Sequence, residues 1–408
     1  MQPLHDIRVL SVTVFLAGPF LSMNLARLGA EVIKVEVPGR GDPVRGNSPF
    51  AGPKGIHSTR QTEADISTPF LKRTQGVKSI TLNLKHPEGR ALFLELAKQS
   101  DVVLENLAPG AMRRLGLGYD EVAAVNSGIV YCSISGYGQT GPYASQPAHD
   151  PQIQGMSGLM DINGEPDGPP TRVGIYISDL VTPLFAAYAI LAALRQRDQT
   201  GQGQYLDASM MDALATLMFM EPLEEAIQQG LPLRSGNNSR SGPTGLYYTQ
   251  DAEVIITAAS DDQWRKLCQA LEAPELLEDA RFASSHGRQE HLVALRQEIQ
   301  QRLGQYSRAE AVERLGKADV PCAPVRTAAE VMADAHFYQR GTLGPMRHGA
   351  LAEPVPGVVP GFPVVFSGGP LPELPGAPTL GMHNQDIFGT LLGLNHEQLQ
   401  QLRQRGVV

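Results

Sequence analysis

Apolar residues in the N-terminal part of the chain alternate between short continuous runs and segments with helical spacing. The runs are rich in Val and Ile, as buried strands are, and cover residues 7–14, 31–36, 101–105 and 128–134. Between the first two runs, Leu21, Leu25 and Leu28 recur along one helical face. Because parallel strands need helical crossovers, this alternation predicts an α/β domain with a mostly parallel, Rossmann-like sheet covered on both faces.

The middle and the end of the chain carry longer helical patterns. Residues 178–197 are apolar almost all round, which predicts a central, buried helix. A strand is predicted at 204–208, a helix at 210–229 and a β-hairpin at 246–257. Further helices are predicted around Trp264 and at 291–303, 308–317, 384–392 and 397–405, and an extended segment rich in Pro and Gly at 335–366.

A linker rich in Gly, Ser and Asn at residues 231–245 separates two regions of different character. A chain of 408 residues also exceeds one ordinary core, so two domains are expected. We predict a large domain built from both chain ends and a smaller α+β domain between them. The predicted segments are 1–201 (large domain, N-terminal part), 202–242 (helix and linker), 243–324 (small domain), 325–334 (return linker) and 335–408 (large domain, C-terminal part).

Composition and charge narrow the possible partners. Hydrophobic residues make up 42% of the chain and the formal net charge is −8, which argues against nucleic acid as the main partner. No apolar run reaches the roughly 18 residues that a membrane span needs, so no membrane partner is expected. The three cysteines, Cys132, Cys268 and Cys322, form no C-x-x-C pair, and this usage predicts a cytoplasmic location.

Several common enzyme motifs are missing from the sequence. The first strand-to-helix turn contains one glycine, Gly18, and Pro19 removes an N–H donor, so the G-x-G-x-x-G pattern of dinucleotide enzymes is not present. Glu36, which could bind a ribose, is better interpreted as a solvated strand end. There is no P-loop and no H-E-x-x-H, and Ser157 lacks the G-x-S-x-G pattern of a nucleophile elbow.

A set of short motifs, weak one by one, occurs in a characteristic order along nearly the whole chain. The motifs are A-G-P (17–19), L-G-A-E-V-I-K-V-E (28–36), G-D-P-V-R-G (41–46), E-N-L-A-P-G (105–110), R-L-G-L-G-Y (114–119), S-I-S-G-Y-G-Q-T-G-P (133–142), M-S-G-L-M (156–160), G-E-P-D-G-P-P (164–170), S-D-L (178–180), T-G-Q-G-Q (200–204) and V-P-C-A-P-V (320–325). In this order they resemble the class III CoA-transferases, also called the CaiB/BaiF family.

The resemblance implies an architecture and an activity. It implies open-ring subunits that interlock as a homodimer, and transfer of CoA from an acyl-CoA thioester to a small acceptor carboxylic acid. It also implies that the CoA thioester is a substrate and that no further cofactor and no metal is needed.

In such transferases the nucleophile is an aspartate at the start of the buried helix after the G-E-P-D-G-P-P segment, and the matching residue is Asp179. A carboxylate with an ordinary pKa of about 3.9 is already ionised at pH 7 and can attack a thioester. The implied intermediates are an aspartyl mixed anhydride and an aspartyl-CoA thioester. Without the resemblance, Ser178 and Asp179 would also suit a helix N-cap, and both roles are compatible.

CoA contacts are carried over from the same resemblance with more alternatives open. The matching positions are Ala17, Leu82, Lys85, Asn106, Arg114, Tyr137 and Gly138. Lys85 and Arg114 suit the phosphates of CoA, although each could equally be a solvated surface charge. Further basic residues that could line the site are Arg40, Arg45, Lys72 and Arg73. The family's N-R-x-K-R-S segment is altered here to residues 74–79 (TQGVKS), which puts the adenine contacts in doubt.

His149 suggests an alternative function. Transferases that resemble this chain usually have an aromatic residue there, whereas the α-methylacyl-CoA racemases of the same fold have a histidine. His149 and Asp179 could then form the acid/base pair of a racemase or epimerase. His149 could also be an acceptor-carboxylate ligand or a packed core residue, and a CoA-binding protein without activity is a further alternative. The stretches after Asp179 favour the transferase.

Overall fold

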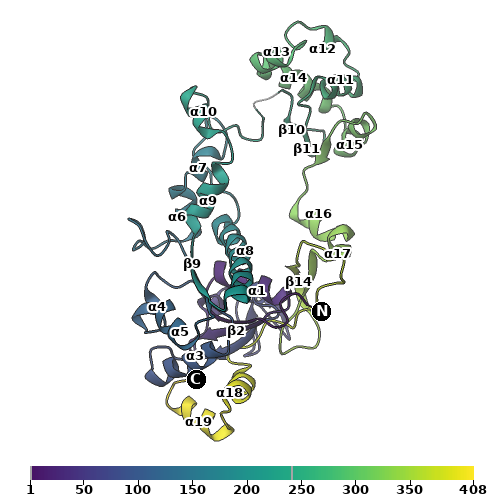
Figure 1. Cartoon of the computed structure of the whole chain (residues 1–408). Helices are drawn as coiled ribbons and strands as arrows, with labels where there is room; N and C mark the ends of the chain where they lie inside the picture. The colour runs from purple at the N-terminus through teal and green to yellow at the C-terminus, as the bar shows by residue number, and fades with distance from the viewer. Residues whose placement is uncertain (1, 240–241) are drawn as a thin grey trace. The chain divides into compact units, whose positions relative to one another are not determined.

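The computed structural model describes residues 2–239 and 242–408 (Figure 1). The described residues form two compact units. The first consists of residues 2–159, 173–221 and 334–408, and the second of residues 160–172 and 222–333. Residues 240 and 241, in the predicted linker, lie outside the described residues. Both chain ends thus contribute to the first unit.

A six-stranded parallel sheet forms the centre of the first unit. Its strand order is β6-β2-β1-β7-β8-β9. The bounds are β1 (Arg8–Val12), β2 (Glu31–Glu36), β6 (Lys78–Thr81), β7 (Val102–Glu105), β8 (Val130–Ser135) and β9 (Gln204–Ser209). The predicted parallel α/β sheet is confirmed, with every neighbouring pair parallel. The sequence pattern did not predict β6, whose four residues (KSIT) lack a continuous apolar run.

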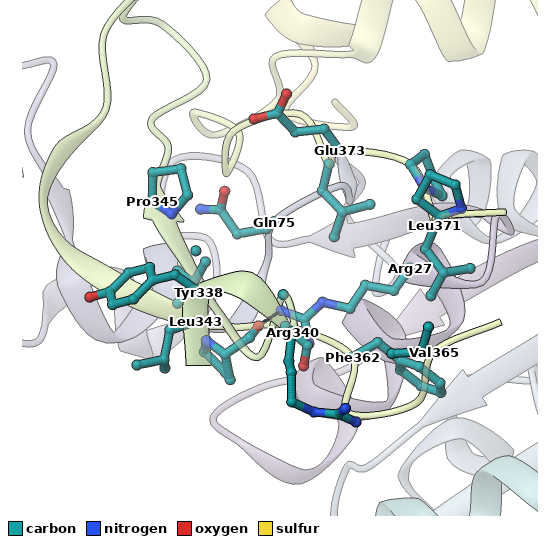
Figure 2. A pocket seen from close by; sticks show the side chains of 18 of the residues that line it. Arg27, Gln75, Tyr338, Arg340, Leu343, Pro345, Phe362, Val365, Leu371 and Glu373 are labelled. Atoms are coloured by element: carbon teal, nitrogen blue, oxygen red, sulfur yellow. Dashed lines mark hydrogen bonds between the residues drawn. The ribbon is translucent and has the colours of Figure 1, made fainter. Parts of the chain in front are cut away.

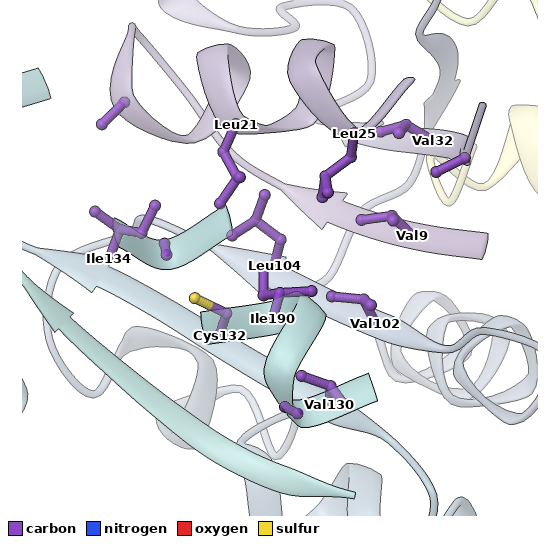
Figure 3. Packing of buried hydrophobic residues seen from close by; sticks show 14 of the residues in the cluster. Val9, Leu21, Leu25, Val32, Val102, Leu104, Val130, Cys132, Ile134 and Ile190 are labelled. Carbon is purple, nitrogen blue, oxygen red and sulfur yellow. The ribbon is translucent and has the colours of Figure 1, made fainter. Parts of the chain in front are cut away.

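Both faces of this sheet are buried, as expected for parallel strands. On one face, Val9, Val102 and Val130 pack against Leu21 of α1 (Ala17–Arg27) and Ile190 of α8 (Ile177–Thr200), as Figure 3 shows. The opposite face carries the helices α3 (Pro87–Lys98), α5 (Tyr119–Val125), α18 (Asn384–Leu392) and α19 (His396–Gln404). The predicted C-terminal helical hairpin is therefore part of the core of the first unit.

The strand order reverses direction between β1 and β7. From β1 the chain moves outward through β2 to β6, and it then returns to the other side of β1 to form β7, β8 and β9. The loops that leave the carboxyl ends of β1 and β7 therefore diverge. In open α/β sheets such a switch point is the place where a ligand binds, and the predicted site motifs of residues 17–19 and 105–110 lie there.

Helix α8 differs from the fully buried helix that its composition predicts. Its buried residues, among them Ile190 and Leu194, pack against α1, β8 and β9. Its other face exposes 52% of Leu184 and 59% of Tyr188. By length and composition α8 also passes for a membrane span, contrary to the expectation from the sequence. Half of an apolar helix is thus uncovered in the single chain.

The return segment and the smaller elements complete the first unit. The segment 335–366, predicted to be extended, begins with the short helix α17 (Ala335–Gln339) and continues as the antiparallel pair β13 (Leu343–Met346) and β14 (Val355–Pro360). The remaining elements are η1 (Pro43–Gly46), β3 (Phe50–Gly52), β4 (Gly55–His57), β5 (Ile66–Ser67), α2 (Thr68–Arg73), α4 (Ala111–Arg114), α6 (Asp150–Met156) and α9 (Met210–Met218).

The second unit has a core of its own around a three-stranded antiparallel sheet. Its strands are β10 (Gly245–Tyr248), β11 (Glu253–Ile256) and β12 (Cys322–Pro324), and its helices are α10 (Leu223–Gln228), α11 (Asp261–Ala270), α12 (Glu275–Glu278), α13 (Ser285–Glu290), α14 (Leu292–Leu303), α15 (Arg308–Lys317) and α16 (Ala328–Ala333). The short helix α7 (Leu159–Ile162) lies at the junction of the two units in sequence. The predicted hairpin and helices are present, but the helix predicted at 210–229 is divided into α9 and α10. Pro222, which cannot continue a helix, stands between them.

Candidate functional site

Asp179 lies in the first turn of α8, where backbone N–H groups have no partner within the helix. Tyr176, not Asp179, is the N-cap residue, and its own side chain makes no capping hydrogen bond. Among the residues that the structure describes, no hydrogen bond or ion pair to the Asp179 carboxylate is found. The capping role that Asp179 could have played is therefore not observed, and its carboxylate is available for chemistry.

Asp150 fixes the start of α8. It is 1% exposed, and its Oδ2 accepts hydrogen bonds from the Ser178 amide at 2.7 Å and from the Ser178 hydroxyl at 2.8 Å. Its other oxygen, Oδ1, accepts a hydrogen bond from Gln154 at 2.6 Å. Asp150 thus holds the residue next to Asp179 in place. The sequence analysis missed this role, because the residues around Asp150 do not indicate that its side chain contacts the backbone of Ser178.

The environment of Asp179 changes its acidity. Burial, followed by the negative charge of Asp150, raises the pKa of Asp179 to about 7, although the positive charge of Arg73 lowers it. The sequence-based expectation of a fully ionised carboxylate at pH 7 therefore needs correction. Near neutral pH both forms of Asp179 are present, and the charged form is less well solvated than in water.

Arg73 and Phe15 connect the loop after β1 to this region. Arg73, at the end of α2, donates a hydrogen bond from Nη1 to the Phe15 carbonyl at 3.0 Å. Phe15 has a φ of 64°, a left-handed conformation that is strained for a bulky residue. Its amide donates to Asp42 at 3.2 Å, and its ring meets the ring of His149 edge-on, with centroids 6.2 Å apart. These contacts hold the strained loop on both sides.

The predicted CoA residues lie in loops at the carboxyl edge of the sheet. Ala17 begins α1 after β1, and Asn106 follows β7, the adjacent strand. Asn106 exchanges two hydrogen bonds with the Val14 backbone, at 2.8 and 2.9 Å, and so joins the two loops of the switch point. Tyr137 and Gly138 follow β8, the next strand along. The structure therefore brings Ala17, Asn106, Tyr137 and Gly138 to three neighbouring loops.

The predicted basic residues differ in their exposure, in their location and in the partners they already have. Arg114 is exposed on α4, and its Nη1 donates to the Pro109 carbonyl at 3.3 Å. Leu82 is buried and Lys85 exposed after β6, which is two strands away from β1. Arg45 is not available to a ligand, because it is buried and pairs with Glu36 at 2.7 Å. Arg40 and Lys72 are exposed.

His149 is exposed just before α6, and no hydrogen bond or ion pair joins it to Asp179 in the described part of the chain. The core-histidine interpretation is therefore wrong. Its ring contact with Phe15 places it beside the same loop that Arg73 contacts. His149 thus lies close to the candidate site.

Two cavities of the first unit differ in their relation to these residues. One of about 410 Å³ lies between the loops after β7 and β8, and Glu105, Gly110, Ser133 and Gln139 are among its lining residues. It borders the motifs predicted for CoA. The other, of about 490 Å³, is lined by Arg27 and residues of the return segment, and contains none of the predicted site residues (Figure 2).

Comparison with known proteins decides the family. The profile of CoA-transferase family III matches residues 4–384. The chain belongs to this family. The predicted resemblance is thus confirmed, and the racemase alternative is not favoured.

Related proteins of this family match over most of their length. The chain is 37% identical to succinyl-CoA–D-citramalate CoA-transferase of Chloroflexus aurantiacus, over 100% of this chain and 98% of that protein. It is 34% identical to succinyl-CoA:glutarate CoA-transferase of Mus musculus, over 100% of this chain and 91% of that protein. The crystal structure of a CaiB/BaiF family protein from Brucella suis superposes with a TM-score of 0.83 at 34% identity, covering 96% of this chain and 99% of that one.

Proposed function

We propose that this family III enzyme transfers CoA from an acyl-CoA thioester to a carboxylic acid, with Asp179 as the nucleophile. The observation that supports this most directly is the Asp179 carboxylate at the N-terminus of α8, without a hydrogen-bond partner among the described residues and beside Arg73. A helix N-terminus offers N–H groups and a positive partial charge to an oxyanion that develops there. Asp150 keeps that helix start in position.

The proposed reaction has four balanced steps. An Asp179 carboxylate oxygen attacks the thioester carbonyl, the C–S bond breaks, and CoA leaves as a thiolate from the mixed anhydride. The thiolate attacks the aspartyl carbonyl and releases the donor acid, leaving an aspartyl-CoA thioester. The acceptor carboxylate attacks the carbonyl of this thioester, the C–S bond breaks, and CoA leaves again as a thiolate from a second anhydride. The thiolate then attacks the acceptor's carbonyl and restores the Asp179 carboxylate, so no metal or redox cofactor is required.

The CoA moiety is proposed to bind along the carboxyl edge of the sheet. The residues proposed to line it are Ala17, Leu82, Lys85, Asn106, Arg114, Tyr137 and Gly138. Arg114 and Lys85 are exposed cations that suit the phosphates. Asn106 would act chiefly by shaping the switch-point loops, because its amide group is already bonded to Val14.

The protein is proposed to be a homodimer of interlocked subunits. The exposed apolar face of α8, with Leu184, Tyr188 and Leu191, supports this proposal, because large apolar patches usually mark an interface. The three free cysteines support a cytoplasmic location. Because the relatives are named for succinyl-CoA, that thioester is the first donor to test.

The test is a transfer assay read by mass spectrometry. Succinyl-CoA is incubated with the wild-type enzyme and a panel of carboxylic acids, and new acyl-CoA products are identified. Asp179→Asn should bind CoA and form almost no product, whereas Asp6→Asn, an exposed control in the same unit, should match the wild type. Full transfer by Asp179→Asn would contradict the proposal. Exchange of the substrate's α-hydrogen with solvent deuterium, lost in His149→Ala, would instead indicate a racemase.

A further inference from the structure

Arg73 differs from Lys34 and Arg45 in what it already binds. Lys34 pairs with Asp42 at 2.9 Å, and Arg45 pairs with Glu36. Arg73 has no such partner: no carboxylate within the described chain lies within 4.0 Å of its guanidinium. One N–H of Arg73 donates to the Phe15 carbonyl. An arginine carries five N–H donors in a planar fork, so most of its binding capacity remains unused.

The loop residue that Arg73 contacts, Phe15, is itself held by other groups. The Phe15 carbonyl that it binds belongs to a residue in a left-handed conformation, whose amide is held by Asp42. The Phe15 ring in turn packs edge-on against His149. The Arg73 guanidinium is therefore anchored to the loop after β1, next to the switch point, and does not move freely in solvent.

Carboxylates act on Arg73 as well, although one of them, Asp42, is already paired with Lys34. Asp179 and Asp42 both act on Arg73, and Asp150 adds its charge behind α8. A substrate with a second carboxylate would be repelled by these groups unless a cation received it. The positive charge of the Arg73 guanidinium acts on Asp179 and lowers its pKa. Burial lowers the pKa of Arg73, which shows that its charge is costly where it is and would gain from an anionic ligand.

We infer that Arg73 binds the remote carboxylate of dicarboxylic substrates, both in the acyl-CoA and in the free acid, and selects them over monocarboxylic ones. This inference rests on the proposed function, in which Asp179 attacks the thioester end of the same acyl group. The remote carboxylate bound to Arg73 and the thioester carbonyl at Asp179 would give the acyl chain two fixed ends. A guanidinium and a carboxylate form a paired, charge-assisted contact that a neutral methyl end cannot make.

The experiment compares two donors that differ only in this group. Succinyl-CoA and butyryl-CoA have acyl chains of equal length, but only the first ends in a carboxylate. Initial rates are measured for the wild type, Arg73→Met, Arg73→Lys and the control Lys54→Met, in which an exposed cation outside the candidate site is removed. Loss of a hydrogen bond to a charged group costs roughly a ten- to hundred-fold factor in kcat/KM.

We expect Arg73→Met to lose this factor for succinyl-CoA alone. At a pH where Asp179 is ionised in every variant, the rate with butyryl-CoA should stay within about twofold. Arg73→Lys should restore part of the succinyl-CoA activity, and Lys54→Met should behave as the wild type. A purely structural role of the Phe15 contact would lower both rates equally and would overturn the inference. If the wild type transferred CoA from neither donor and from no other acyl-CoA, the proposed function itself would fail.

A second measurement needs no variant and covers the case in which Arg73→Met does not fold. Free succinate and glutarate should compete with the acyl-CoA donor of the wild type at concentrations at least tenfold lower than butyrate and valerate. Equal inhibition by acids with one and two carboxylates would also overturn the inference.

Discussion

At the scale of single residues, the main finding is the contrast between Asp179 and Asp150. The two carboxyl groups belong to adjoining helix starts, yet Asp150 has three hydrogen-bond donors and Asp179 has none among the described residues. A motif comparison identified Asp179, because its position in the S-D-L segment is distinctive. The partners of Asp150 and the raised pKa of Asp179 depend on side chains that meet only after folding, and the sequence alone could not predict them.

The acidity of Asp179 predicts the pH dependence of its first reaction. Only the ionised carboxylate attacks a thioester, and burial raises its pKa to about 7. The rate of enzyme acylation should therefore rise about tenfold between pH 6 and pH 8. Arg73→Met removes a charge that lowers this pKa, so its profile should move to higher pH. Rapid-quench measurements with succinyl-CoA test both statements, and a flat profile across this range would contradict them.

Glu105 predicts a pH dependence of stability. Burial raises the pKa of Glu105 to about 7, from 4.5. Between these values the folded state holds a proton that the unfolded state has released, so stability falls as pH rises and the loss is complete above pH 7. A shift of this size corresponds to about 3 kcal/mol.

Glu105→Gln removes this titration and keeps an acceptor for the Leu107 amide, which binds Glu105 at 2.8 Å. The fall in the free energy of unfolding between pH 5 and pH 8 should therefore be smaller in the variant, as urea denaturation can measure. An identical pH dependence in wild type and variant would show that Glu105 has an ordinary pKa.

At the scale of elements, strands with long apolar runs were predictable and short polar ones were not. The strand at 31–36 was predicted with the bounds that β2 shows, whereas β6 (KSIT) is a strand only because it pairs with β2 at the sheet edge. The helix predicted at 210–229 is interrupted at Pro222. The helical propensity of the segment as a whole outweighed this single helix-breaking residue in the prediction. The predicted CoA residues reach one edge of the sheet because parallel strands end there together.

The start of α8 yields a prediction about Asp150. Asp150→Asn keeps one oxygen but cannot satisfy Gln154 and both donors of Ser178 equally well. We expect a loss of about 2 kcal/mol in the free energy of unfolding, since hydrogen bonds to a buried charge are involved. Transfer should slow at least tenfold while CoA still binds, because the nucleophile is displaced. Asp161→Asn, an exposed aspartate, is the control and should change stability by less than about 0.5 kcal/mol.

At the scale of the whole molecule, α8 shows where the hydrophobic pattern of a single chain misleads. An apolar helix was predicted to be buried, but Leu184 and Tyr188 remain exposed in one chain. An exposed apolar face of this kind is typical of an interface and supports the proposed dimer. Sequence identity to relatives over the full chain established the family, whereas the predicted domain boundaries remain predictions.

The dimer is testable through this face. Tyr188→Glu and Leu184→Glu place charges on an apolar surface, and in light scattering at micromolar concentration we expect them to shift the protein from dimer to monomer. Val293→Glu is a matched control, because Val293 is 74% exposed on α14 of the second unit. A wild type that is monomeric, or variants that remain dimeric, would contradict the role of this face.

The most direct test of the central claim is whether an acyl-CoA modifies Asp179 when no acceptor is present. Wild-type enzyme is mixed with succinyl-CoA, treated with hydroxylamine to trap an activated carboxyl group, and digested for peptide mass spectrometry. A hydroxamate on Asp179, not detected in Asp179→Asn and unchanged in Asp6→Asn, is the predicted result. A trapped group at another residue, or substrate turnover with no trapped group on Asp179, would contradict the aspartyl mechanism.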